Sequence, residues 1–167
     1  MVELAKSFAR NCILNRTLAG CLFLSLVASL SSQAQVFPRG NGISLSGIDR
    51  FDAYVGINDW TGMSQDLQEF RLSTQRLFEE GLVTVGAPRR VAAKDYLICR
   101  VQAAMVGGVV AYSAEIEYWL RNSVGAHHLL WESGNIATVE PAQFNEQLLA
   151  TECVKYFSDE WLKWNPQ

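Results

Sequence analysis

Two glutamates are the residues of this chain whose type and spacing come closest to catalytic chemistry. Glu115 and Glu117 are two apart, so in a strand they point to the same face. Two such carboxyls could act as the acid and base of a glycoside hydrolase, but only if they flank a sugar held in a cleft. A strand face offers no cleft, so we expect salt bridges with Arg100 across a hairpin and assign no catalytic residue.

The two histidines, His127 and His128, are the other group with chemical potential. Neighbouring side chains on an extended chain point apart, and Glu132 alone is at a spacing that could complete a metal site. We therefore expect solvated loop histidines and no metal. Phosphate-binding glycine loops and the Gly-x-Ser-x-Gly motif are absent, so no cofactor is predicted.

The amino-terminal segment has the order of parts of a secretory signal. Basic residues precede an apolar run at 18–30, and small residues follow at 32–34, which predicts cleavage between Ala34 and Gln35. A competing lipoprotein signal ends at Cys21, but it lies near the start of the apolar run, where a lipidated cysteine does not belong. The run is also too short to span a bilayer. The predicted location is periplasmic or secreted.

Cleavage would leave 133 residues, enough for one domain with its own core. Lys6, Arg10, Arg16 and Glu3 would depart with the leader, leaving 11 basic and 16 acidic residues and a net charge of −5. Arg89-Arg90 is the longest basic run, so nucleic acid is not an expected partner. Residues 35–46 are rich in glycine, serine and proline and are expected to form a flexible lead-in to a domain at 47–167.

Periodicity predicts one helix between strands in the first half of the domain. Alternation indicates a strand at 51–58, and an apolar stripe indicates a helix at 64–80, with Ser64 as its N-cap and Gly81 ending it. The sequence LVTV (82–85) is expected to be a strand parallel to the first one, through a right-handed crossover. Residues 86–95 are expected to be a loop.

A meander and a closing helix are predicted for the second half. Strands are expected at 96–106 and 109–120, joined by the hairpin signal Gly107-Gly108. A shorter strand follows at 128–133, with a continuation at 136–139, and a helix starts at Pro141 and runs to Lys163. The order β-α-β-β-β-β-α predicts an α+β two-layer sandwich, with two helices on one face of a mostly antiparallel sheet.

Two consequences follow from this arrangement. Cys99 and Cys153, which remain after cleavage, both occupy core-facing positions, where they would form either a disulfide or two buried thiols. The polar face of the hairpin would meet water or a partner protein. The residues of this possible interaction surface are Arg100, Gln102, Glu115, Glu117 and Trp119.

The segments EEGLVTV, DYLICRVQ, GGVVAYSAEIEYWL, LLWESG and YFSDEWLKWNP resemble a recurring type of small secreted bacterial protein of unassigned function. The resemblance covers residues 64–166 and carries no catalytic residue. The order of elements is also similar to the lipopolysaccharide-assembly lipoproteins and to the N-terminal domain of the Tol-system periplasmic protein. The resemblance implies a small α+β domain of the cell envelope.

These observations favour a non-enzymatic domain that binds another cell-envelope protein or assembly. A first alternative is a domain that binds a small apolar ligand or a lipid in a cleft between sheet and helices, as the 49% hydrophobic composition suggests. A second alternative is a hydrolase whose candidate catalytic residues would be His127, His128, Glu115 and Glu117.

Overall fold

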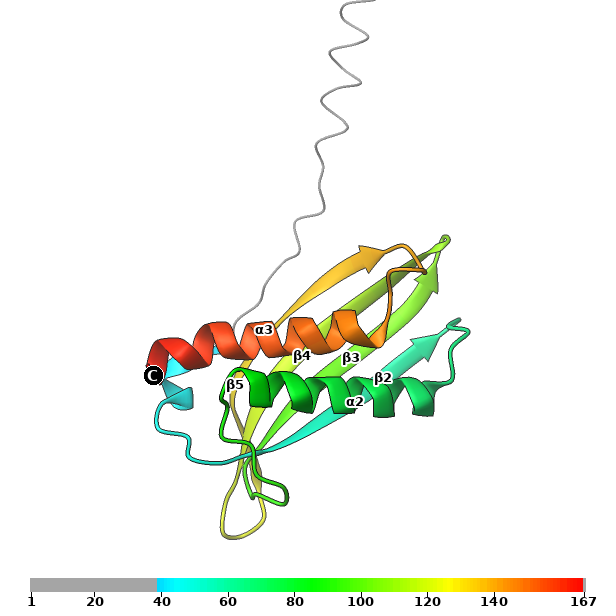
Figure 1. Ribbon diagram of the computed structural model, residues 1–167. Coiled ribbons are helices and arrows are strands. Elements are labelled where there is room, and N and C mark those ends of the chain that lie inside the picture. Colours follow the sequence, from blue (N-terminus) through cyan, green and yellow to red (C-terminus); the bar gives the residue numbers. More distant parts are fainter. Residues whose placement is uncertain (1–38, 167) are drawn as a thin grey trace, which may run out of the picture. The chain divides into compact units, whose positions relative to one another are not determined.

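The computed structural model describes residues 39–166, which form four long strands, one two-residue strand and two helices (Figure 1). Every neighbouring pair of strands is antiparallel except β2 and β3, which are parallel. In their order across the sheet the strands are β1 (Arg39–Gly40), β5 (His127–Val139), β4 (Val109–Arg121), β3 (Tyr96–Val106) and β2 (Asp52–Thr61).

The two helices, α2 (Leu67–Thr84) and α3 (Glu146–Trp164), lie side by side over one face of the sheet (Figure 1). Each begins at a side-chain cap: Asp66 accepts a hydrogen bond from the backbone N–H of Glu69, and Asn145 accepts one from Leu148. Such caps satisfy amide groups that the first helical turn leaves without partners. The predicted α+β fold, with two helices on one face of a mostly antiparallel sheet, is therefore confirmed.

The predicted strand at 82–85 is wrong, because these residues belong to the end of α2. Gly81 does not stop the helix but gives α3 room: a Cβ at this position would lie 2.6 Å from Cγ2 of Val154. The helix therefore continues through the apolar LVTV stretch. The parallel partner of β2 is β3, reached through α2 and the loop at 86–95.

Several further boundaries differ from prediction, among them the end of β2, which runs to Thr61 and not to residue 58. β5 is one unbroken strand, because Gly134 passes so close to β4 that a Cβ would lie 2.5 Å from the carbonyl oxygen of Ala114. α3 begins at Glu146 after an Asn145 cap, not at Pro141, and α2 begins three residues after Ser64. Residues 39–45 form β1 and the 3-10 helix η1 (Gly42–Leu45), neither of which was predicted.

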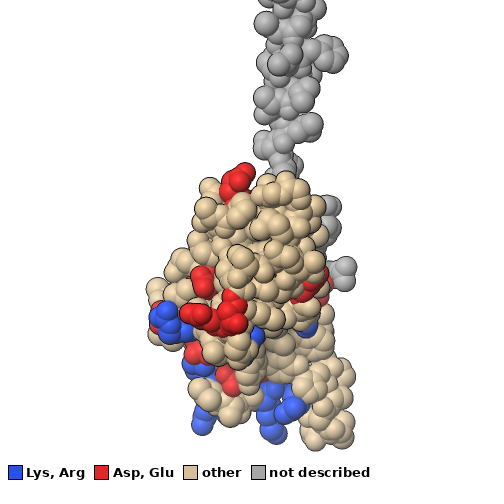
Figure 2. Space-filling view, turned by 90° about the vertical axis from the view of Figure 1, so that its right-hand side faces the viewer, with Lys and Arg blue, Asp and Glu red and all other residues tan. Residues whose placement is uncertain are grey.

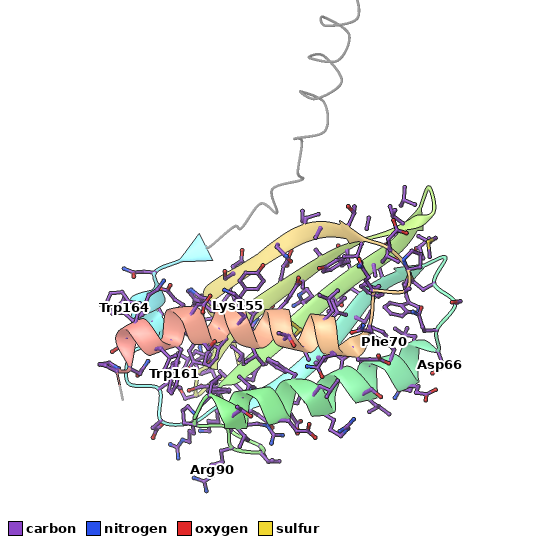
Figure 3. All side chains as sticks on the ribbon, turned by 45° about the horizontal axis from the view of Figure 1, so that its top comes forward. Asp66, Phe70, Arg90, Lys155, Trp161 and Trp164 are labelled. Atoms are coloured by element: carbon purple, nitrogen blue, oxygen red, sulfur yellow. A yellow bond between two sulfur atoms is a disulfide. The ribbon has the colours of Figure 1, made fainter. Side chains whose placement is uncertain are left out.

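The core lies between the sheet and the helices, where Phe70 and Trp161 can be followed in Figure 3. A disulfide crosses it: Cys99 on β3 is bonded to Cys153 on α3, their Cα atoms are 5.8 Å apart, and both residues are fully buried. Of the two alternatives for these cysteines, the disulfide is the one observed. The predicted cleavage site at Ala34 and Gln35, and the alternative at Cys21, lie outside the described residues. Within the described part of the chain, no helix is long and apolar enough to cross a membrane.

Candidate functional site: the open face of the sheet

One face of the sheet carries no helix, and strand alternation places there the side chains that point away from α2 and α3. We call this surface the open face. Its residues are Tyr54 on β2; Tyr96, Arg100 and Gln102 on β3; Ser113, Glu115, Glu117 and Trp119 on β4; and Ile136 on β5. All five residues of the predicted interaction surface lie on it.

Glu117 is the centre of the polar part of the open face. Arg100 donates two hydrogen bonds to its carboxylate, of 2.7 Å from Nε and 2.8 Å from Nη2, and the indole Nε1 of Trp119 donates a third at 2.7 Å. Only 6% of Glu117 is exposed. Burial by itself would raise the pKa of Glu117, but the hydrogen bonds from Arg100 and Trp119 outweigh it and lower that pKa. Glu117 is thus held as a carboxylate in a fixed ion pair.

Glu115 lies in a different environment from Glu117. It stands directly opposite Arg100 in the register of β3 and β4, yet the guanidinium turns to Glu117. Glu115 instead lines a shallow depression of about 280 Å³, together with Gln102, Ser113 and Ile136. The predicted ion pair with Arg100 is confirmed for Glu117. Both oxygens of Glu117 are taken up by donors from Arg100 and Trp119.

An aromatic row crosses the strands where β2 and β3 begin. The rings of Tyr54 and Tyr96 meet edge to face at 6.0 Å, and those of Tyr96 and Trp119 are stacked at 6.3 Å. Tyr54 remains 46% exposed. The sequence analysis singled out Trp119 but missed both tyrosines, although strand alternation puts them on the same face and could have identified them.

The histidines at the start of β5 point to separate partners. The ring of His127 contacts Tyr96 and accepts a hydrogen bond of 3.2 Å from Arg121, whereas His128 pairs with the amide of Asn122. Across residues 39–166, no group of three or more potential metal ligands comes together.

Asp52 anchors the loop at 86–95 to the sheet, a role that the sequence did not reveal. It is 5% exposed, and its carboxylate accepts hydrogen bonds from the backbone of Ala53 and Ala92 and from the hydroxyl of Tyr54. Burial would raise the pKa of Asp52, but these hydrogen bonds and the nearby Arg89 lower it. The loop and the aromatic row are thereby held by one buried carboxylate.

No protein-family model matches the chain, and no curated protein matches it in sequence. Solved structures of similar backbone include the PelC dodecamer from Paraburkholderia phytofirmans, with 17% identity and a TM-score of 0.48. A variant of that dodecamer with one leucine-to-methionine change also has 17% identity, with a TM-score of 0.49. Each comparison covers 77% of this chain and 98% of the other. At this identity and score the likeness is one of backbone arrangement alone.

Proposed function

We propose that this protein is a non-enzymatic domain of the bacterial cell envelope, periplasmic or secreted, that binds another envelope protein through the open face. The observation that carries the proposal is the combination, on one helix-free surface, of a fixed ion pair and exposed apolar side chains. Aromatic residues and arginine are enriched in protein interfaces, and a charge already paired within its own subunit costs less to bury on binding. Arg100, Glu117 and Trp119 have this character.

Three further features support the cellular location. The Cys99–Cys153 disulfide is the kind of bond that persists in an oxidising compartment. The leader expected at residues 1–34 would direct the chain to that compartment. The resemblance to small secreted bacterial proteins supports the same location.

The binding test compares two apolar side chains of similar exposure on opposite sides of the domain. Ile136 on the open face is 58% exposed, and Leu72 on α2 is 52% exposed. A photo-crosslinking residue at the neighbouring position Ser113 should capture a discrete partner when the protein is exported in its own host. Ile136→Asp should abolish this product, whereas Leu72→Asp should leave it unchanged. Loss in both variants, or crosslinks without a discrete partner, would overturn the proposal.

A separate measurement tests the export prediction. The intact mass of the exported protein, taken without reductant, should correspond to a chain that begins at Gln35 and contains the disulfide. A chain that begins at Cys21 and carries acyl groups would show that the protein is a membrane-tethered lipoprotein.

The alternative of an apolar ligand in a cleft between sheet and helices has no observation in its favour. That layer contains the disulfide and large, fully buried side chains, among them Phe51, Phe70, Phe78 and Phe157. The hydrolase alternative likewise gains nothing, because Glu117 is committed to Arg100 and the two histidines have separate partners.

A further inference from the structure

Two loops leave the sheet at the same end, although the chain runs through two long strands between them. Tyr96 at the start of β3 pairs with Trp119 near the end of β4, so the loop at 86–95 and the loop at 122–126 emerge together. Both lie at the lower end of the domain in Figure 1. We call this end, including Arg50 just before β2, the loop pole.

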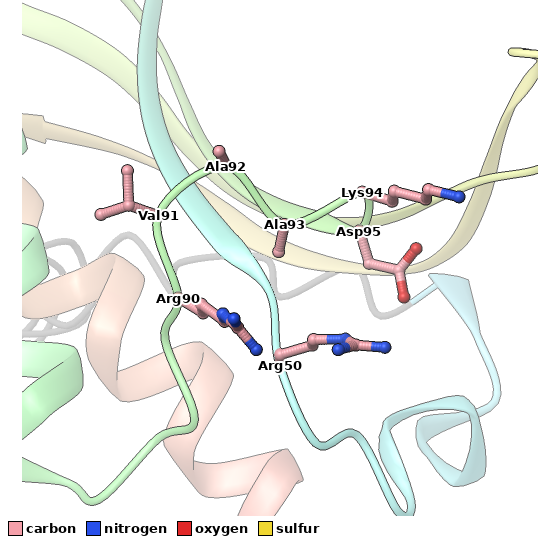
Figure 4. Close-up of a pocket in the computed structure, with 7 residues that line it drawn as sticks. All are labelled: Arg50, Arg90, Val91, Ala92, Ala93, Lys94 and Asp95. Atoms are coloured by element: carbon pink, nitrogen blue, oxygen red, sulfur yellow. The ribbon is translucent and has the colours of Figure 1, made fainter.

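Three exposed cations surround a depression at the loop pole. Arg50, Arg90 and Lys94 come from two segments of the chain and, together with the acidic Asp95, line a depression of about 440 Å³ (Figure 4). Arg50 is 3.8 Å from Asp49, both of them exposed, while within the described residues the side chains of Arg90 and Lys94 make no ion pair. Arg90 extends away from the body of the domain (Figure 3). Figure 2 shows basic side chains gathered at this end, with the larger acidic groups above them.

The backbone of the loop that carries these cations is fixed before any ligand arrives. The N–H of Ala92 donates a 2.7 Å hydrogen bond to Asp52, and the N–H of Arg90 donates one of 2.7 Å to the carbonyl of Phe51. Ala92 has a φ of 59°, in the left-handed region that a residue with a side chain occupies only when its surroundings hold it there. Binding at the pole therefore does not have to order this loop.

The tips of both loops carry an apolar side chain that projects into solvent. Val124 is 84% exposed and Val91 is 69% exposed, the two highest values among the large hydrophobic residues that the structure describes. Asn122 fixes the second tip by accepting hydrogen bonds from the N–H groups of Val124 and Ala126. The aromatic row of Tyr54, Tyr96 and Trp119 lies on the sheet directly behind these tips.

We propose that the loop pole docks on the surface of a bilayer that contains anionic phospholipids. Basic side chains are attracted to anionic headgroups, short apolar tips enter the headgroup boundary, and tyrosine and tryptophan favour the membrane–water interface. A protein partner would instead require a contiguous apolar centre, whereas the two valines are single tips among cations. The mature chain carries an expected net charge of −5, so attachment through these cations would orient the domain with the loop pole toward the bilayer. The cations and the two valine tips lie outside the open face, whereas the aromatic row is shared with it through Trp119, which donates a hydrogen bond to Glu117.

The test measures whether the mature chain, which starts at Gln35 and contains the disulfide, floats together with lipid vesicles in a density gradient. Binding should occur on vesicles of phosphatidylethanolamine and phosphatidylglycerol, weaken with added salt, and be absent on phosphatidylcholine alone. Each cation near an anionic surface contributes about 1 kcal/mol, or roughly fivefold in partitioning, so replacing three of them should weaken binding about 100-fold. The corresponding variant is Arg50→Gln with Arg90→Gln and Lys94→Gln.

A matched control distinguishes the effect of the cations at the loop pole from the effect of a change in net charge. Arg76→Gln with Lys155→Gln and Lys163→Gln removes the same three charges from exposed positions on the helices, and it should leave vesicle binding unchanged. Equal losses in the two triple variants, or no binding to anionic vesicles by the unmodified protein, would overturn the proposal. So would saturable binding of inorganic phosphate that displaces the vesicles at constant ionic strength, because it would define a small-anion pocket.

A second variant tests the apolar tips. Val91→Ser with Val124→Ser should weaken vesicle binding without changing its salt dependence, since it removes insertion and leaves the cations in place. Because neither Val91 nor Val124 contributes to the core, the thermal stability of this double variant should equal that of the unmodified protein. Full vesicle binding by this double variant would refute the membrane-insertion part of the proposal.

Discussion

Reducing the Cys99–Cys153 disulfide should remove a large part of the stability of this domain. The bond joins residues 54 apart in the sequence, so in the unfolded chain it closes a long loop. In the chain-entropy model a loop of this length corresponds to about 14 cal/mol/K of lost conformational entropy, or about 4 kcal/mol at room temperature. Domains of this size have a total stability of about 5–15 kcal/mol, so the reduced protein should retain about 1–11 kcal/mol.

The same loss of free energy predicts a shift in the melting temperature. Unfolding entropy is about 2.1 cal/mol/K per residue, which for the 128 described residues is about 0.27 kcal/mol/K. A loss of about 4 kcal/mol should therefore lower the Tm by about 15 °C. Urea unfolding of the oxidised and reduced forms of one preparation measures the free energy difference directly, and differential scanning calorimetry measures the shift in Tm.

The slope of the urea transition tests the physical origin of the effect. If the bond acts by restricting the unfolded chain, the reduced form should expand further on unfolding and have a larger m-value. Cys99→Ala with Cys153→Ala should behave like the reduced protein, apart from a small packing loss. Coincident midpoints for the oxidised and reduced forms would refute the reasoning, because the bond would then contribute nothing to stability.

Three further substitutions test polar side chains that are buried or that cover the edge of the sheet. Glu117→Gln should lower the free energy of unfolding by about 2 kcal/mol at neutral pH, because it weakens two charged hydrogen bonds from Arg100. The pKa of Glu117 is lower in the folded state than its ordinary value of 4.5, so its stabilising contribution is present above that pH and is lost as pH falls through the folded value. Urea titrations of Glu117→Gln and the unmodified protein should therefore converge in acid, and a constant difference would contradict the assignment. Glu152 is the opposite case: burial raises its pKa, although the hydroxyl of Tyr112 and the amide of Asn135 oppose the shift, so this carboxyl costs stability as pH rises from its ordinary value of 4.5 through the raised folded value. Glu152→Gln should consequently make the protein more stable at neutral pH and lose this advantage as pH falls, which thermal melts across that range would measure; a loss of stability at neutral pH would contradict it. Gln75 covers the free edge of β2, because its side chain accepts a hydrogen bond from the Val55 N–H at 2.6 Å and donates one to the Ala53 carbonyl at 2.8 Å. Gln75→Ala should therefore lower the free energy of unfolding by about 1–2 kcal/mol and speed hydrogen exchange at the Val55 amide. Unchanged exchange at that amide would show that the edge is protected in another way.

The open face could be assigned from strand alternation, whereas the loop pole could not. Arg100 and Glu117 are 17 residues apart, but the hairpin signal at Gly107-Gly108 sets their register and brings them together. Arg50 and Lys94 meet only because β2 and β3 are neighbours in the sheet. The sequence analysis paired β2 with residues 82–85, so it had no means of bringing these cations together.

Local pattern was sufficient where each residue's neighbours along the chain determine its conformation. The strand at 96–106, its hairpin and the apolar face that contains Cys99 follow from a period of two and two glycines, and the structure agrees with each. At residues 82–85 the local pattern was not sufficient to predict the structure. A short apolar run fits a strand or a buried helical turn equally well, and here the helix wins because Gly81 allows Val154 of α3 to pack against it.

The sequence by itself determined the α+β class, the hairpin, the core-facing positions of both cysteines and the polar face of the sheet, because these depend on periodicity and on turn residues. Tertiary structure alone decided which strand lies parallel to β2, that Gly81 and Gly134 sit inside elements, and that Arg50, Arg90 and Lys94 share one depression. Each of these depends on how closely two distant segments approach, a distance that no pattern within either segment encodes.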